Sequence, residues 1–132
     1  MSDTEVAWAA GLWDGEGSAG AYRMGQRLPI MKLSLSQTNQ EIVDRFFAAI
    51  GHVGRVYGPY PPHNTGRQPF WIWQLVGARS EEVMDRLWPY LSSPKRLQYD
   101  AAVQVAWQAR TGDVKTCTAC GLPLDANHDL TD

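Results

Sequence analysis

Apolar residues recur at two different periods along the chain, and the two periods alternate in a regular order. Residues 29–36 show the clearest period of two, because polar residues separate Met31, Leu33 and Leu35. Such alternation is typical of a strand with one buried face. Residues 39–50 instead place apolar side chains at intervals of three and four, as an amphipathic helix does. The local pattern therefore predicts both strands and helices.

Turn and capping residues divide the rest of the chain into further elements. Thr4 and Ser80 are suitable N-caps for two helices, and the glycine-containing run 14–17 is expected to end the first of them. The helices are predicted at residues 4–13, 39–50, 80–91 and 94–110, and the strands at residues 18–24, 29–36, 53–57 and 70–76. This order predicts an α+β fold, in which helices cover one face of a four-stranded antiparallel sheet and the other face is polar and open.

Length and composition are those of one globular domain. The chain has 132 residues, of which 44% are hydrophobic, and it contains six tryptophans. No apolar run approaches the roughly 20 residues that span a bilayer, and residues 1–5 are polar and acidic, unlike a secretion signal. The two cysteines do not make a disulfide framework. We therefore expect an intracellular, cytoplasmic protein that is not secreted and has no membrane partner.

Charge is distributed unevenly along the chain. The net charge is −2, which is unusual for a protein that binds nucleic acid. Residues 112–132 contain four acids and one base, a net charge of −3, whereas residues 17–77 contain six bases and two acids, a net charge of +4. The central segment could attract DNA, although it could also be an ordinary solvated surface. We therefore divide the chain into a domain at 1–111 and an acidic tail at 112–132.

Small residues share one face of the first predicted helix. Ala7, Gly11 and Gly15 are four residues apart, so a second backbone could approach them closely. Glycine costs a helix about 1 kcal/mol relative to alanine, and a close contact would explain two of them. If that contact is the same helix of a second copy, a two-fold axis brings the two helix ends together. The alternative is that the run Asp-Gly-Glu-Gly at residues 14–17 only stops the helix and begins a turn.

The same helix end contains two acids, Asp14 and Glu16. Carboxylates that converge across a two-fold axis repel each other unless cations lie between them. Mg²⁺ takes oxygen ligands, often one or two carboxylates together with a substrate phosphate, and a metal pair can activate water for hydrolysis of a phosphodiester. One Glu16 per DNA strand would suit cleavage of both strands by a symmetric dimer.

The run Ala-Ala-Gly-Leu-Trp-Asp-Gly-Glu-Gly at residues 9–17 resembles the LAGLIDADG signature of a family of homing endonucleases. Five of its nine positions are identical, and Glu16 stands in place of the second acid. The order of elements over residues 5–107 is also similar to that of the family. The resemblance implies an αββαββα domain with a saddle-shaped sheet, and a single-motif protein that makes a double-strand break as a homodimer.

The resemblance also implies a metal-dependent active site. Glu16 and the backbone of Gly15 would bind Mg²⁺ or Mn²⁺, and Gln37 would position a water. Lys95 and Gln98 match a K-x-x-Q segment that opens the family's last helix, where Lys95 would stabilise charge on the phosphate with support from Gln98. Without the resemblance, Gln37 could simply end a strand, and Lys95 could be a basic residue of a surface helix. The dimer interface implied in this way contains Ala7, Gly11, Asp14 and Gly15.

DNA would be recognised by the open face of the sheet, from which side chains can reach base edges in the major groove. The candidates are Ser18, Tyr22, Arg27, Lys32, Ser34, Arg67, Ile72 and Gln74. Arg27 and Arg67 lie in predicted loops, so contacts with phosphates are an equal alternative for them.

The tail contains part of a zinc-binding pattern. Cys117 and Cys120 form a C-x-x-C pair typical of a zinc knuckle, and His128 could be a third ligand. A structural zinc site has four ligands, and no fourth is obvious. A second copy could complete the site, or the tail could be acidic and free of metal.

Three functions are therefore open. The first is a metal-dependent homing endonuclease, encoded by a mobile intron or free-standing. The second is a DNA-binding regulator or an RNA splicing maturase with the same fold but without cleavage. Retention of Glu16, Gln37 and Lys95 together favours cleavage. The third is a dimeric scaffold that uses the glycine face and has no affinity for nucleic acid.

Overall fold

The structure, a computed structural model, describes residues 2–23, 25, 28–61, 68–111, 115–116 and 123–124. The helices are α1 (Asp3–Glu16), α2 (Gln40–Ala49), α3 (Ser80–Leu87), the 3-10 helix η1 (Trp88–Tyr90) and α4 (Ser93–Thr111). The strands are β1 (Gly17–Tyr22), β2 (Ile30–Gln37), β3 (Arg55–Tyr60), β4 (Phe70–Val76), β5 (Lys115–Thr116) and β6 (Pro123–Leu124). Among the described residues, no helix combines the length and the hydrophobicity needed to cross a bilayer.

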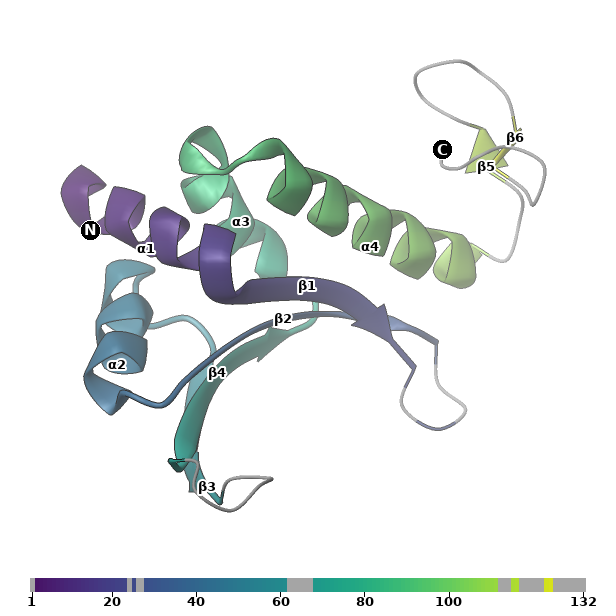
Figure 1. Ribbon diagram of the computed structural model, residues 1–132. Helices are drawn as coiled ribbons and strands as arrows, with labels where there is room; N and C mark the ends of the chain where they lie inside the picture. The colour runs from purple at the N-terminus through teal and green to yellow at the C-terminus, as the bar shows by residue number, and fades with distance from the viewer. Residues whose placement is uncertain are drawn as a thin grey trace.

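Strands β1 to β4 form one antiparallel sheet in the order β1-β2-β4-β3. Leu35 of β2 lies opposite Gly17 of β1 on one side and Trp73 of β4 on the other, and Val56 of β3 pairs with Trp73. The helices lie on one side of the sheet, and the sheet curves away from them, so that its uncovered face is concave (Figure 1). The predicted α+β fold, with four antiparallel strands and helices on one face, is confirmed.

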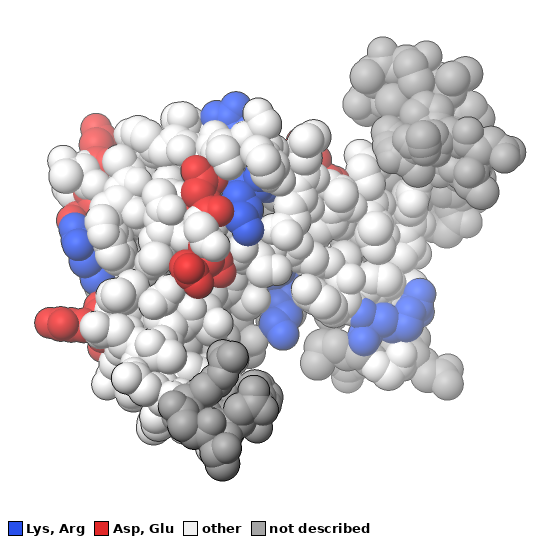
Figure 2. Space-filling model, viewed as in Figure 1, with Lys and Arg blue, Asp and Glu red and all other residues white. Residues whose placement is uncertain are grey.

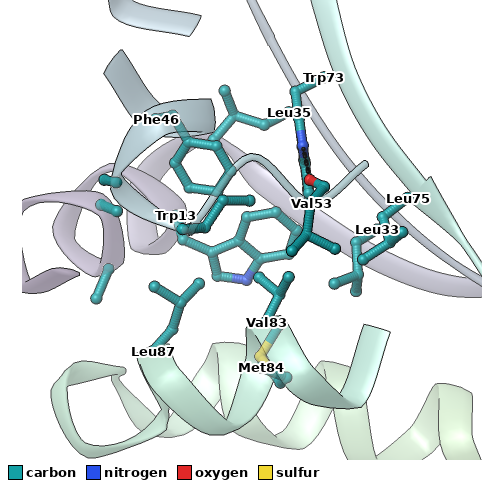
Figure 3. Close-up of a cluster of buried hydrophobic side chains, with 14 of the residues drawn as sticks. Trp13, Leu33, Leu35, Phe46, Val53, Trp73, Leu75, Val83, Met84 and Leu87 are labelled. Atoms are coloured by element: carbon teal, nitrogen blue, oxygen red, sulfur yellow. Dashed lines mark hydrogen bonds between the residues drawn. The ribbon is translucent and has the colours of Figure 1, made fainter. Parts of the chain in front are cut away.

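The core lies between the helices and the sheet and is built around three aromatic side chains. Trp13 from α1, Phe46 from α2 and Trp73 from β4 are fully buried. The ring of Trp13 stacks on Phe46 with centroids 6.2 Å apart, and Trp73 meets Phe46 edge-on at 5.0 Å. Aliphatic side chains of β2 and α3 surround this cluster (Figure 3). Because buried aromatic rings remove large areas from water, the cluster fixes α1 on the sheet and so places its last residue.

An ion pair joins α1 and α2 at the surface. The Arg45 guanidinium donates two hydrogen bonds to the Glu5 carboxylate, at 2.9 and 2.7 Å, and lies 3.9 Å from the centroid of the Trp8 ring. These hydrogen bonds lower the pKa of Glu5 and raise the pKa of Arg45. Because both side chains are exposed, solvent screens the pair and its effect on stability is small.

Helix α1 begins earlier and ends later than predicted. Its N-cap is Ser2, whose Oγ accepts a hydrogen bond from the backbone N–H of Glu5 at 3.1 Å, so the prediction of Thr4 as the cap is wrong. The glycine-containing run 14–17 does end the helix, but it does so at its last residue: the helix continues to Glu16 instead of stopping at residue 13, and the N–H of Gly17 bonds to the carbonyl of Trp13. Burial of Trp13 in the core holds the last turn despite the glycine within it.

The helix predicted over residues 80–91 is two elements. Arg79 is in the N-cap position, whereas Ser80 is buried inside α3 and its hydroxyl donates a hydrogen bond to the carbonyl of Gly77. The prediction of Ser80 as the cap is therefore wrong. Helix α3 ends at Leu87, and the 3-10 helix η1 follows, where Pro89 has no N–H to continue an α-helix.

The strand boundaries agree with prediction at β4 and differ elsewhere by a few residues. Strand β3 begins at Arg55 and continues to Tyr60, past a shift of register between Tyr57 and Tyr60. Gly58, at this shift, has a φ of 134°, a conformation that favours glycine. The loop predicted to begin at residue 58 therefore begins later, because the strand bends at the glycine without ending.

Candidate functional site

Glu16 is the last residue of α1, and its exposed carboxylate lines a hollow of 240 Å³. Ser36, Gln37 and Thr38, from the end of β2, and Phe70, at the start of β4, line the rest of the hollow. Among the residues that the structure describes, none forms a hydrogen bond or ion pair with the Glu16 carboxylate. The carboxylate is therefore available to a cation or to a hydrogen-bond donor.

The register of the sheet explains why Glu16 and Gln37 meet. Gly17 pairs with Leu35, so the residue before Gly17 comes level with the residue after Leu35, next to Gln37. A side chain at Gly17 would collide with the buried Trp13, because a Cβ there would lie 2.1 Å from its ring. The close fit of Trp13 on Gly17 thus fixes the passage from helix to strand, and with it the place of Glu16.

Lys95 and Gln98, from the first turns of α4, contact the backbone of β1. The Nζ of Lys95 donates a hydrogen bond to the carbonyl of Gly17 at 2.5 Å, and Oε1 of Gln98 accepts one from the N–H of Ala19 at 3.0 Å. These bonds satisfy backbone groups of an edge strand and attach α4 beside it. Lys95 therefore lies next to the residue that follows Glu16, whereas Gln98 binds two residues farther along β1.

Asp14 connects the motif helix to the start of α4. Its Oδ1 accepts hydrogen bonds from the backbone N–H and from the hydroxyl of Ser92, each at 3.0 Å. The carboxylate of Asp14, the first acid of residues 9–17, is thus hydrogen-bonded within the chain. The carboxylate of Glu16, the second acid, has no such bond to a described residue. The predicted place of Asp14 in a dimer interface stays a prediction, and the structure adds a role in holding α1 and α4 together.

The small residues of α1 lie on its outer side. Gly11 and Gly15 are exposed and Ala7 is half-buried, whereas Val6, Ala10 and their neighbours on the other side face the core. A Cβ built on Gly11 or on Gly15 meets nothing within 4 Å. No contact with another described residue of the same copy therefore requires glycine at these two positions.

The uncovered face of the sheet presents polar side chains from every strand. Ser18, Ser34, Gln74 and Arg55 are successive register partners and form a row straight across β1, β2, β4 and β3. The alternation of the strands places six of the predicted DNA-binding residues on this face: Ser18, Tyr22, Lys32, Ser34, Ile72 and Gln74. The prediction grouped these residues from their sequence pattern alone.

Sequence reasoning missed two residues of this face, Arg55 and Tyr57. Both are exposed, and they lie opposite Gln74 and Ile72 of β4. The sequence did contain a signal for their place on this face, because the apolar Val56 lies between them and packs against the core. In a strand, the two neighbours of a core residue point to the opposite face.

Several predicted site residues lie outside the described residues. They are Arg27, Arg67, Cys117, Cys120 and His128. Their roles in DNA binding and in zinc binding stay predictions. In the part of the chain that the structure describes, no group of three or more His, Cys, Asp or Glu side chains could hold a metal ion. The described residues of one copy therefore form no multi-ligand metal cage, and the predicted metal-binding role of Glu16 stays a prediction.

Charged side chains of the described residues are dispersed over the surface that Figure 2 shows. Among the described residues in this view, Lys and Arg are interspersed with Asp and Glu and separated by uncharged residues (Figure 2). The described Lys and Arg side chains therefore form no dense basic patch on the surface in this view. Among the described residues of the uncovered face, Lys32 and Arg55 are basic and lie on different strands.

Comparison with known proteins identifies the fold. No known family model matches the sequence, and no curated protein matches it. Among solved structures, the homing endonuclease I-CvuI in complex with its target in the presence of Ca is similar with a TM-score of 0.60 at 21% identity, over 83% of this chain and 70% of that one. The LAGLIDADG meganuclease I-AabMI bound to uncleaved DNA has a TM-score of 0.59 at 14% identity, over 80% and 37%. The group I intron-encoded homing endonuclease I-CeuI complexed with DNA has a TM-score of 0.53 at 14% identity, over 76% and 52%.

The chain has the LAGLIDADG fold. The run at residues 9–17 that resembles the signature falls on α1 and on the first residue of β1. The residues that carry the sequence resemblance therefore lie where a helix and a strand of the LAGLIDADG fold meet. The chain spans 70% of I-CvuI but only 37% of I-AabMI.

Proposed function

We propose that the protein is a site-specific DNA endonuclease that requires Mg²⁺ or Mn²⁺ and acts as a homodimer with one Glu16 per subunit. The observation that carries this proposal is the free, exposed carboxylate of Glu16 at the end of the motif helix, in a hollow shared with Gln37. The DNA-bound state of I-AabMI and I-CeuI, which share the fold, supports duplex DNA as the partner.

The uncovered face of the sheet is the proposed DNA-binding surface. It is concave and lies opposite the helices (Figure 1), and a β-sheet can enter the major groove. The row of Ser18, Ser34, Gln74 and Arg55 supplies hydroxyl, amide and guanidinium groups. Such groups pair with base edges and with phosphates, so this face can both position the duplex and read its sequence.

The donors at the hollow fit a hard divalent cation. Glu16 provides an exposed carboxylate at the C-terminal end of α1, where the last backbone carbonyls lack partners within the helix and the dipole is negative. The carbonyl of Gly15 belongs to this turn. Mg²⁺ is commonly held by one or two carboxylates with water and substrate phosphate, which agrees with the absence of a larger acidic cluster among the described residues. Such an ion, when bound, supplies Lewis acidity and a more acidic water.

Gln37 of the hollow would orient the reactants, and Lys95, which is not one of the lining residues, would act from the adjoining start of β1. Gln37 is close enough to Glu16 to line the same space, and its amide can hold a water or a phosphate oxygen by hydrogen bonding. Lys95 places a positive charge at the carbonyl of Gly17. That charge is near the place where the phosphate would become more negative during cleavage, which is a stabilising arrangement.

A second copy is needed for cleavage of both strands, and α1 is the proposed contact. Gly11 and Gly15 are exposed and leave open space on this helix. Each glycine costs the helix about 1 kcal/mol relative to alanine, and no contact with a described residue of the same copy offsets that cost. Close packing of two α1 helices about a two-fold axis would offset it and bring two Glu16 residues to the centre of the DNA site.

The proposal is tested with duplexes selected from a randomised pool by binding in the absence of Mg²⁺. The selected duplexes are then incubated with Mg²⁺ or with EDTA, using the wild type, Glu16→Gln and the control Glu41→Gln, which changes another exposed acid. We expect double-strand cleavage in Mg²⁺ by the wild type and by the control, and none in EDTA or with Glu16→Gln. Binding by Glu16→Gln should be retained.

The other functions give different results in the same experiment. A DNA-binding regulator would bind selected duplexes and cut none of them in Mg²⁺. A splicing maturase would bind structured RNA in preference to duplex DNA, and a scaffold would bind neither. An intracellular location and a mobile intron as host element stay predictions.

A further inference from the structure

A second hollow, of 150 Å³, lies on the uncovered face of the sheet, toward the end of the β1–β2 hairpin. Tyr22, Ile30, Lys32, Gln74 and Val76 line it. These residues come from three strands and are close because Tyr22 pairs with Ile30 and Lys32 pairs with Val76. The hollow therefore depends on the register of the sheet and belongs to the proposed DNA-binding face.

The walls of this hollow are apolar although they face solvent. Tyr22 is 49% exposed and Val76 is 46% exposed, and both are large hydrophobic side chains. Ile30 is half-buried beside them. Exposed apolar side chains that gather at a concave place favour an apolar contact with a partner.

Gly20 leaves the space in which the ring of Tyr22 lies. A Cβ at Gly20 would lie 2.7 Å from Cζ of the Tyr22 ring, so the ring occupies the space that a side chain at position 20 would need. The Nζ of Lys32, the register partner of Gly20, lies 5.4 Å from the centroid of the same ring. The tyrosine is thereby fixed as a wall of the hollow, and its position is defined before any ligand arrives.

Polar groups stand beside the apolar walls. Gln74 offers an amide that can pair with N6 and N7 of adenine, and Lys32 offers a donor for N7 or O6 of a neighbouring guanine. In the major groove only thymine presents a methyl group, and thymine is the partner of adenine. An apolar hollow next to an amide therefore matches an A·T pair, with the methyl group in the hollow.

We propose that this hollow reads the 5-methyl group of a thymine in each half of the target site. The proposal rests on the proposed function, because it takes the uncovered face to be the DNA-binding surface. Tyr22 is six residues beyond Glu16 along β1, about 20 Å at the rise of a strand. This length corresponds to about six base pairs, so the thymine should lie roughly five to seven base pairs from the centre of the site.

The test replaces each thymine of a selected duplex in turn by deoxyuridine, which lacks only the methyl group. The wild-type protein should bind the substituted duplex about four-fold more weakly when the replaced thymine is at one particular position in each half-site, because one buried methyl group is then missing. Replacement of any other thymine should leave the affinity unchanged. Val76→Thr exchanges a methyl for a hydroxyl and should bind the thymine and deoxyuridine duplexes equally. Val105→Thr is the matched control, because Val105 is 49% exposed on α4, and it should discriminate as the wild type does.

Any other result contradicts the proposal that the hollow reads a thymine methyl group. The results below distinguish failure of this proposal from failure of the proposed function. If duplexes are bound and cut but no thymine is sensitive to loss of its methyl group, the hollow does not read methyl groups and the endonuclease stands. The same conclusion follows if Val76→Thr still discriminates. If the pool yields no bound duplex at all, the proposed function fails and this inference fails with it.

Discussion

The Nζ of Lys95 lies 2.5 Å from the carbonyl oxygen of Gly17, so an amine of α4 binds the residue that follows Glu16 directly. Gln98 repeats the connection one turn later through the N–H of Ala19. Helix α4 therefore controls where the first residues of β1 lie. Because Glu16 is attached to them, we expect Lys95 to position Glu16, in addition to the charge proposed for it at the site.

Replacing Lys95 tests both roles. Lys95→Met removes the charge and the hydrogen bond, and we expect the rate of the cleavage step to fall by at least ten-fold while the affinity for DNA changes little. The free energy of unfolding should fall by about 1 kcal/mol, the usual worth of such a bond. Single-turnover cleavage and urea unfolding measure the two effects. Lys95→Arg should restore the free energy of unfolding more fully than the rate of cleavage. Full activity of Lys95→Met would contradict a role of Lys95 at the site.

Two glycines of the motif should respond in opposite ways to alanine. Gly17→Ala introduces a Cβ 2.1 Å from the ring of Trp13, so it should destabilise the folded chain itself. Gly11→Ala meets open space in one copy and should stabilise the isolated helix by up to about 1 kcal/mol. At the same time it should weaken the proposed dimer, and Gly11→Leu should weaken it further.

Sedimentation equilibrium and thermal unfolding at several protein concentrations separate these effects. For Gly11→Leu we expect a largely monomeric protein that keeps its fold and has lost double-strand cleavage. A wild-type protein that is monomeric at micromolar concentration in the presence of DNA would contradict the dimer contact. A dimeric Gly11→Leu protein would show that copies meet elsewhere.

Arg55 should contribute to DNA binding, although the sequence analysis counted only its charge and did not place it on the uncovered face. It is exposed in the row with Gln74 on the uncovered face. If it contacts a phosphate, Arg55→Ala should weaken binding and lower the slope of log K against log salt by about one. Arg79→Ala is the control, because Arg79 lies outside the sheet and is paired with Glu82. An unchanged salt slope for Arg55→Ala would exclude a phosphate contact.

Tyr99 should make the protein less stable in alkali. Burial raises the pKa of its phenol, and the carboxylates of Glu81, Asp85 and Asp100 raise it further. The unfolded chain ionises this phenol near its ordinary pKa of about 10, where the folded chain still keeps it neutral. Stability from Tyr99 is therefore complete below this pH and is lost as the pH rises through the raised value. Urea unfolding from pH 8 to 11 should show a smaller loss for Tyr99→Phe, and equal losses would contradict the prediction.

Much of the fold could be predicted because period and register are local properties. The alternation in β2 and β4 was visible in the sequence, and with it the side of the sheet that each residue occupies. The end of α1 was not, since its last turn is held by burial of Trp13 against residues far along the chain. Ser80 was mistaken for a cap for a similar reason: the hydroxyl binds the carbonyl of Gly77 instead of a helix N–H.

The candidate site could be predicted in composition but not in its contacts. The sequence pointed to Glu16 and Gln37, and the structure brings them to one hollow. The bonds from Lys95 to Gly17 and from Ser92 to Asp14 join residues that are remote in sequence. No periodicity reports such pairs, because they follow from how α4 lies on β1.

Both outer edges of the sheet are closed to a further strand. Along β1, side chains of Lys95 and Gln98 occupy backbone groups that another strand would need. Along β3, the shifted register at Gly58 and the missing N–H of Pro59 interrupt the pattern that a partner strand would have to match. The molecule therefore resists growth into aggregates by strand addition, although it leaves a broad sheet face uncovered. Two copies that meet in solution are directed away from the strands and toward the helical surface.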